Sequence, residues 1–322
     1  MRVGPPTEGP LFPDEGPAGP RIVRRVRGIS LEILAFILVT LLLPALLVLA
    51  ALTDLVLWLA RRKHWTGVRL AAFGWWFLFG EMRALAGLLG IWIATGGPLG
   101  GGSLRRARLL YALRVHWSGS HLAGVRVLFG LRFDVVDGEL AGPGPVVIMM
   151  RHASIIDNLL PDVLIAKPHG IGLRFVIKRE LQMIPTIDIG GRWVPTLYVR
   201  RASDNPEREI TALRSLTRNL GEHEGILIYP EGTRFTTRKL ARAQEVVAER
   251  QPDVAPLAAR LHHILPPRLG GPLALLDDAK RDGIDIVFCG HAGFDGYQHV
   301  SDIWSGRLVG STIHVRFWRH PV

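Results

Sequence analysis

His152 and Asp157 are the pair of residues in this sequence whose types and spacing best suit acid–base chemistry. They follow an apolar run, 146–150, of the kind that is buried in a parallel sheet. On one ideal helix the two would lie about 140° apart, because each residue turns about 100°. At a strand-to-helix turn they could hydrogen-bond, and a carboxylate that holds one imidazole nitrogen leaves the other free to accept a proton. The spacing therefore allows His152 to be a base that Asp157 orients. The alternative is that the two residues lie in the same loop by chance.

A second motif, residues 230–234, follows another apolar run at 226–229. Gly232 permits a turn that a residue with a Cβ would adopt only with strain. Glu231 and Arg234 would then lie at the carboxyl end of a strand, where open α/β sheets bind ligands. An arginine at that place can hold a phosphate through two hydrogen bonds.

Further cations lie between these motifs. Lys178 and Arg179 come directly after an apolar run, and Arg200 and Arg201 follow another. Each of them, taken singly, is typical of a solvated surface. They gain significance only in combination with the two motifs.

Two other kinds of site receive little support. Ser154 suggests a Ser/His/Asp hydrolase, but the sequence lacks a Gly-x-Ser-x-Gly turn, and a residue two positions from His152 is expected to face away from it. His262 and His263 are adjacent and would point in different directions, so we expect no metal site.

From residue 131 onward, strand-like runs alternate with helical patterns. This alternation predicts an α/β fold for the elements that must position these residues. We expect strands at 131–136, 146–150, 174–177, 226–229, 284–289 and 312–318, and helices at 158–166, 205–220, 237–250 and 255–263.

The N-terminal third is different in composition. Residues 1–28 form a Pro/Gly-rich and then basic stretch, which we expect to be a disordered tail. Residues 29–102 are predicted to be membrane helices, since residues 33–52 carry no charge and about 20 residues cross a bilayer. Glu81 and Arg83 interrupt the second apolar stretch, 71–95, so it is expected to be a hairpin partner or an interfacial helix. Residues 103–322 would be the catalytic domain, which opens with a basic amphipathic helix at 104–130 that we expect to contact the membrane.

The charge and cysteine content limit the possible partners. The chain has 322 residues, a net charge of +11 and one cysteine, Cys289. The positive charge predicts an anionic partner. The basic residues lie beside apolar segments and form no nucleic-acid-binding motif, so an anionic lipid is favoured and nucleic acid is not expected. Cys289 is expected to be buried in a strand.

The order of five blocks, RHASIID, FVIKREL, LYVRR, YPEGTRFT and HHILPPRLGG, resembles the glycerolipid acyltransferase family of 1-acylglycerol-3-phosphate and lysophospholipid acyltransferases over residues 130–320. The resemblance is strongest to the lysocardiolipin and lysophosphatidate branch. Arg151 departs from the family, which usually has Asn before the histidine, so the acyl acceptor is harder to infer.

The resemblance implies a central mixed, largely parallel sheet flanked by helices, as in glycerol-3-phosphate acyltransferase, preceded by membrane helices. It implies an enzyme of phospholipid biosynthesis that moves a fatty acyl group from acyl-CoA or acyl-carrier protein to a lysophospholipid, with lysophosphatidate first and phosphatidic acid as product. His152 would be the base and Asp157 its orienting residue. The head-group binders would be Lys178, Arg201, Glu231, Gly232, Thr233 and Arg234.

By the same resemblance, no metal or other cofactor is expected, and the enzyme would lie in the cell membrane with its catalytic domain on the cytoplasmic side. An acyltransferase for another lysophospholipid is one alternative. A catalytically silent, lipid-binding membrane scaffold is the other.

Overall fold

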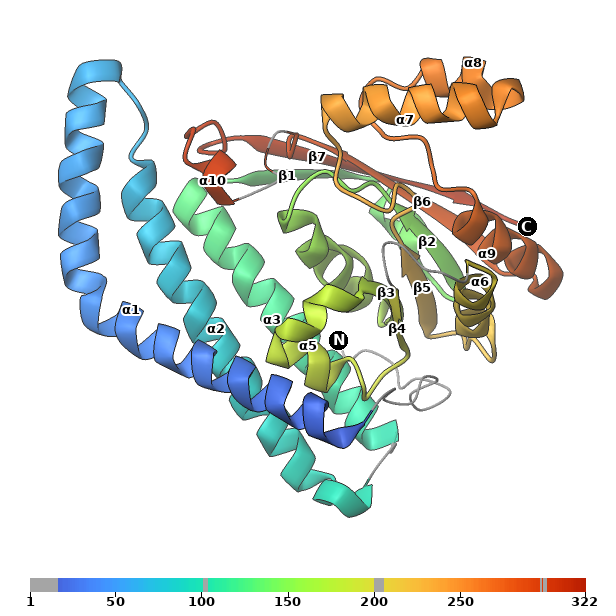
Figure 1. The fold of residues 1–322 in the computed structure, drawn as a ribbon, viewed down its shortest axis with the longest axis horizontal. Helices are drawn as coiled ribbons and strands as arrows, with labels where there is room; N and C mark the ends of the chain where they lie inside the picture. Colours follow the sequence, from blue (N-terminus) through green and yellow to red (C-terminus); the bar gives the residue numbers. More distant parts are fainter. Residues whose placement is uncertain (1–16, 101–103, 200–205, 296, 298–299) are drawn as a thin grey trace.

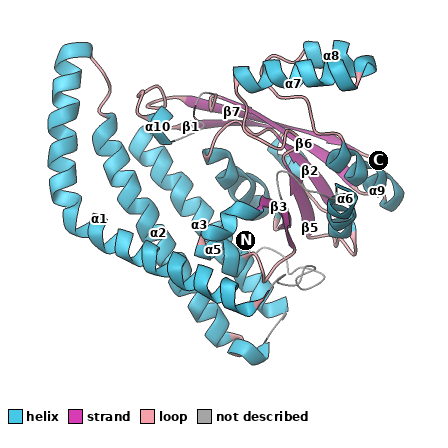
Figure 2. Cartoon of the chain, viewed as in Figure 1, coloured by secondary structure: helices cyan, strands magenta, loops and turns pink. Residues whose placement is uncertain are grey.

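One sheet runs through the part of the chain that follows the N-terminal helices, with helices on both of its faces (Figures 1 and 2). The structure, a computed structural model, describes residues 17–100, 104–199, 206–295, 297 and 300–322. Neighbouring strands are parallel except for β6 and β7. The predicted α/β class with a mixed, largely parallel sheet is confirmed. The strand order is β1 (Arg132–Val136), β7 (Thr312–His320), β6 (Asp285–Ala292), β2 (Val146–Met150), β5 (Glu224–Ile228), β3 (Gly172–Lys178) and β4 (Thr196–Val199).

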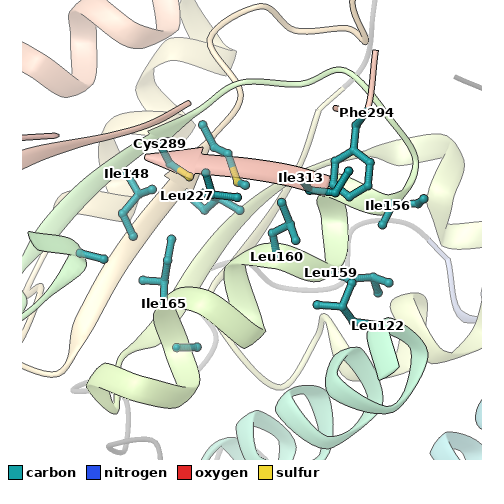
Figure 3. Close-up of a cluster of buried hydrophobic side chains, with 14 of the residues drawn as sticks. Leu122, Ile148, Ile156, Leu159, Leu160, Ile165, Leu227, Cys289, Phe294 and Ile313 are labelled. Atoms are coloured by element: carbon teal, nitrogen blue, oxygen red, sulfur yellow. The ribbon is translucent and has the colours of Figure 1, made fainter. Parts of the chain in front are cut away.

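The central strand β2 shows why the sheet needs helices on both faces. All five of its residues are buried. Because successive side chains point to opposite faces, Ile148 and Met150 join the core on one face and Val147 and Met149 join the core on the other. Figure 3 shows the first of these cores, where Ile148 lies near Cys289 and Leu227. Cys289 is buried in β6, as expected.

The helices of the two faces come from different parts of the chain. The first core receives side chains from α3 and from the segment that follows β2, whereas the second receives them from α6 and α9. These elements are α3 (Leu104–Phe129), the 3-10 turn η3 (Ile156–Leu159), the π-helical turn η4 (Pro161–Ala166), α4 (Lys167–His169), α6 (Pro206–Arg214) and α9 (Gly270–Asp282).

The strand β4 and the helix α9 are among the elements that the sequence did not predict. The strand β4 has four residues at the edge of the sheet, too few for a clear pattern. The helix α9 begins with two glycines and Pro272, residues that favour turns, although proline fits the first turn of a helix. Of the predicted helices, α7 (Thr237–Arg250) has the expected bounds, and α8 (Ala255–Ala259) is shorter than predicted.

Two long apolar helices precede this domain: α1 (Ala18–Arg61) and α2 (Thr66–Ala94). Both are long and apolar enough to cross a membrane by length and composition. Figure 1 shows α1 bent into two limbs, and Pro44 within it lacks the N–H that a straight helix requires. Asp54 of α1 accepts hydrogen bonds from the backbone N–H groups of Gly67 and Val68, so one carboxylate caps the start of α2.

The charged residues of α2 face protein. The Glu81 carboxylate accepts hydrogen bonds from Trp117 Nε1 at 2.7 Å and Thr186 Oγ1 at 2.8 Å. Arg83 donates to Ser120 Oγ of α3 at 2.6 Å. The helix therefore packs as a hairpin partner between α1 and α3, one of the two arrangements predicted for it.

The N-terminal boundary differs from the prediction. Residues 1–16 lie outside the described part of the chain, whereas the basic cluster at 21–27 belongs to α1. Arg24 and Arg25 pair with the buried carboxylate of Asp188, in α5 (Pro185–Gly190), each at 2.9 Å. The predicted tail 1–28 is thus wrong from Ala18 onward, because these ion pairs fix the start of α1 to the domain. The limits proposed for the three domains stay predictions.

The basic helix α3 packs on α2 and on η4, and ten of its residues are buried. Its contact with a membrane stays a prediction. Arg106 is buried and donates to the Gly97 carbonyl, and Arg114 pairs with Asp162. These two cations therefore serve the packing of α3 against the rest of the chain, whereas Arg105, Arg108 and Arg126 are exposed.

A buried ion pair joins β3 to β5 (Glu224–Ile228) near the amino-terminal ends of these strands, away from His152 and the 230–234 turn. Arg174 holds Glu224 through two hydrogen bonds, of 3.0 and 2.9 Å, and both side chains are fully buried. Arg174 also donates to the carbonyls of Leu216, Arg218 and Asn219. The pair fixes the register of β3 against β5, and with it the relative position of their carboxyl ends.

We expect Glu224→Leu to lower the free energy of unfolding by about 3–5 kcal/mol, because it leaves the buried Arg174 charge without its counter-charge. Denaturation of the purified chain in detergent measures this loss. The matched control is Glu222→Leu, at an exposed position two residues away. Equal stability of the two variants would show that the buried pair contributes little.

Candidate active site

The motifs predicted from sequence meet at one edge of the sheet. Strands β2, β5 and β3 are parallel neighbours, so His152, the 230–234 turn and Lys178 all lie at or just beyond carboxyl ends of strands. The carboxyl end of β6 lies beside that of β2, and it adds His291. The carboxyl edge of a parallel sheet is where such folds bind ligands.

His152 is oriented by Asp157. The Nδ1 atom of His152 lies 3.2 Å from Asp157 Oδ2, and the same oxygen accepts the backbone N–H groups of Ala153 at 2.6 Å and Ser154 at 2.7 Å. Asp157 is fully buried in η3, and His152 is 9% exposed. The strand-to-turn arrangement predicted from the spacing is therefore present. It leaves the Nε2 atom of His152 without a hydrogen bond to the part of the chain that the structure describes.

Two neighbours of this pair were missed in the sequence. Tyr229 lies against the His152 ring, with ring centroids 4.4 Å apart, and burial raises the pKa of its phenol well above the ordinary value. His291 Nε2 lies 3.0 Å from the Arg151 carbonyl and 3.6 Å from Asp157 Oδ2. Burial lowers the pKa of His291, although Asp157 opposes this, so the neutral ring is favoured beside the carboxylate. The position of His291 at the end of a predicted strand was the one available signal.

Glu231 joins the two motifs. Its Oε1 accepts the backbone N–H of His152 at 2.7 Å, and its Oε2 accepts that of Leu265 at 2.9 Å. Burial raises the pKa of the Glu231 carboxyl, and these two N–H groups partly offset the rise. Because both oxygens are occupied by backbone, the geometry favours a positioning role for Glu231 over the head-group contact expected from sequence.

The other predicted binders are placed as follows. Gly232 has φ +64°, the left-handed conformation that the turn requires. Its N–H donates to the Tyr229 carbonyl at 2.9 Å. Thr233 Oγ1 and the Arg234 carbonyl both receive a hydrogen bond from Lys239 Nζ. Lys178 ends β3 at the same edge, and Arg201 lies outside the described residues.

Arg151, the residue that departs from the expected pattern, connects three loops at the rim. Its guanidinium pairs with Asp295 and donates to the carbonyls of His263 and His291. Half-burial alone would raise the pKa of the Asp295 carboxyl, but the hydrogen bonds and charge of Arg151 lower it below the ordinary value. Arg151 thereby ties the loop after β6 and the 262–265 segment to the end of β2.

Comparison with known proteins gives three findings. Residues 132–260 match the family model described as Acyltransferase. The mouse (Mus musculus) protein 1-acyl-sn-glycerol-3-phosphate acyltransferase epsilon is 26% identical over 164 residues, which cover 50% of this chain and 43% of the relative. The chain thus aligns with less than half the length of this curated relative.

Among solved structures, the chain is similar to the 1-acyl-sn-glycerophosphate (LPA) acyltransferase PlsC from Thermotoga maritima. The TM-score is 0.42 and the identity 15%, with 75% of this chain and 87% of that chain covered. A likeness of this degree carries no information about activity.

We expect Glu231→Gln to lower the free energy of unfolding by about 1–3 kcal/mol, because the amide nitrogen of Gln would face a buried backbone N–H. Hydrogen exchange should become faster at the amides of His152 and Leu265. Glu249→Gln, at an exposed position of α7, is the matched control. Unchanged exchange at both amides would contradict the positioning role.

Proposed function

We propose that this chain, whose residues 132–260 match the acyltransferase family model, transfers a fatty acyl group from a thioester to the free hydroxyl of a lysophospholipid. The observation that supports this most is the buried Asp157 carboxylate, which holds one nitrogen of His152 and leaves the other without a partner in the described chain. The family resemblance predicted from the motifs is confirmed by the match, and the mouse relative makes 1-acylglycerol-3-phosphate the first acceptor to test.

In the proposed reaction His152 is the general base. Asp157 accepts the Nδ1 proton, so Nε2 is the basic nitrogen. As Nε2 removes the proton of the acceptor hydroxyl, that oxygen attacks the thioester carbonyl carbon. The tetrahedral intermediate then collapses, the carbon–sulfur bond breaks, and the thiol leaves with the proton from the imidazolium. The new ester forms in one displacement, because the attacking hydroxyl belongs to the substrate.

The oxyanion and the acceptor phosphate require cations at the same edge. The Gly232 N–H donates to the Tyr229 carbonyl within its own turn. We therefore propose that Lys178, at the end of β3, stabilises the oxyanion. For the phosphate we propose Arg234, with Arg201 and Thr233 as further contacts. A cation at each place would stabilise negative charge in a site from which water is largely excluded.

The serine hydrolase alternative is disfavoured by the local geometry. Ser154 is fully buried, and its Oγ accepts the backbone N–H of Ile156 at 3.1 Å. The hydroxyl therefore stabilises the turn that carries Asp157. A nucleophilic serine would instead have to lie at the His152 ring.

We further propose that α1 and α2 hold the enzyme in the cell membrane, with the catalytic domain on the cytoplasmic side. The support is the length and apolar composition of the two helices. Large apolar side chains of α1, such as Leu41 and Leu49, are exposed. The protein-facing orientation of Glu81 and Arg83 keeps the charges of α2 away from such an apolar surrounding.

We expect His152→Ala to lower the transfer rate by about 100-fold or more, the usual contribution of a general base. The assay follows thioester cleavage with and without lysophosphatidate. His116→Ala, at an exposed position of α3, is the control. Near-normal turnover of folded His152→Ala would refute the assignment. For the wild-type chain, acceptor-independent release would indicate a thioesterase, and absence of release a scaffold.

We expect Asp157→Asn to retain the fold but to lower kcat by about 100-fold or more, since the charge that stabilises the imidazolium is lost. The side-chain oxygen of Asn can still accept the N–H groups of Ala153 and Ser154. Its amide would occupy the place of Oδ1, which has no hydrogen-bond partner in the described chain. Asp157→Ala, which also removes the acceptor of those N–H groups, should in addition lower thermal stability. Full activity of the Asn variant would contradict the role of Asp157.

A further inference from the structure

His291 lies near the carboxyl end of β6 and is a buried titratable group to which the proposed reaction gives no part. Its side chain has no exposed surface, so it cannot touch a substrate. The ring packs edge-on against Phe294, with the two ring centroids 5.7 Å apart. A histidine in such a place can influence the reaction only through the protein groups that it contacts.

Two hydrogen bonds of opposite direction join His291 to Arg151, the residue that precedes the base. His291 Nε2 lies 3.0 Å from the Arg151 carbonyl oxygen, and the Arg151 guanidinium donates to the His291 carbonyl. The Arg151 N–H also donates to the Cys289 carbonyl at 3.0 Å. These contacts fasten the end of β2 to the end of β6 directly before His152.

The peptide group between Arg151 and His152 is held at both of its polar atoms. Its carbonyl oxygen faces His291 Nε2, and its N–H donates to Glu231 Oε1 at 2.7 Å. The next carbonyl, that of His152, accepts the Phe235 N–H at 2.8 Å. Because a peptide group is planar and moves as one unit, these contacts fix the direction in which the His152 side chain leaves the backbone.

The acceptor decides which tautomer His291 adopts. A carbonyl oxygen can only accept, so Nε2 carries the hydrogen and the neutral ring leaves Nδ1 bare. The same Nε2 lies 3.6 Å from Asp157 Oδ2, too far for a good hydrogen bond but near enough for its N–H dipole to act on the carboxylate. Burial lowers the pKa of His291 despite the opposing charges of Asp157 and Asp295, and the charge of Arg151 adds to this lowering. A neutral ring leaves the Asp157 charge available to His152.

We propose that His291 is a positioning residue for the reaction, which holds the Arg151–His152 peptide so that the His152 ring meets both Asp157 and the acceptor hydroxyl. The inference rests on the proposed function. Asp157 orients the ring through its side chain, whereas His291 orients it through the backbone. Since a misplacement of about 1 Å can lower a catalysed rate about 100-fold, a partial loss of this support should lower kcat and leave substrate binding intact.

The test compares His291→Leu with His291→Gln in the full chain in detergent. Leu removes the donor, whereas the Gln amide can place an N–H near the position of Nε2. We expect kcat of the Leu variant to fall about tenfold, while the KM values for palmitoyl-CoA and lysophosphatidate change by less than about twofold. The Gln variant should recover most of kcat. An unchanged kcat in the Leu variant, an equal loss in both variants, or a larger change in KM than in kcat would overturn the proposal.

Two further variants separate positioning from a general loss of stability. His314→Leu is the matched control, because His314 lies opposite Ala292 on the neighbouring strand β7 and is exposed. It should retain kcat, and a similar loss in this variant would contradict the proposal. If His291→Leu does not fold, His291→Asn replaces it, since the shorter Asn amide does not reach the Arg151 carbonyl. Its kcat should again fall below that of the Gln variant, and equal values would count against the donor role.

Hydrogen exchange separates this inference from the proposed function, because it requires no turnover. In His291→Leu the amide of His152 should exchange about tenfold faster, while the amide of Leu265, which Glu231 also holds, should be unchanged. If the wild-type chain acylates no lysophospholipid, the proposed function fails, but this local change still supports the positioning contact. Unchanged exchange at His152, or acceleration spread over the whole sheet, would overturn the inference.

Discussion

The site depends on one oxygen atom, Asp157 Oδ2. It accepts two backbone N–H groups of the loop that follows β2 and lies at hydrogen-bond distance from the His152 ring. A buried carboxylate is costly unless it is hydrogen-bonded, so the loop has to close around it in this conformation. The interaction that shapes the loop is therefore the one that fixes the tautomer of His152. Glu231 then holds the same loop from β5 through the His152 N–H.

Arg151 and the N-terminal helices extend this arrangement outward. Arg151 donates to backbone carbonyls and pairs with Asp295 in neighbouring loops, so the residue beside His152 also holds the rim of the candidate site together. At the other side, Arg24 and Arg25 bind Asp188 and fix α1 to the domain. An apolar pair of helices and the polar edge of the sheet are thus parts of one packed unit, which suits the proposed reaction, whose substrates contain both a phosphate and a fatty chain.

Much of the fold was predictable because it follows from short-range patterns. The run 146–150 is a buried strand as expected, and α7 has its predicted bounds. The misses have physical causes. The strand β4 is a short edge strand, and the segment after β2, predicted as one α-helix, forms 3-10 and π-helical turns instead. Two cations of α3, Arg106 and Arg114, are alike in sequence to its exposed ones, yet contacts within the chain decide their environment.

For the site, the sequence by itself determined the chemistry: a histidine and an aspartate five residues apart, and a glycine-containing turn with a glutamate and an arginine. Those residue types limit what the groups can do whatever their surroundings. The tertiary structure alone decided which groups meet. Glu231 was expected to bind substrate, but both oxygens face backbone N–H groups, because β5 lies beside β2. The position of His291 likewise depends on strand order, which residue spacing does not encode.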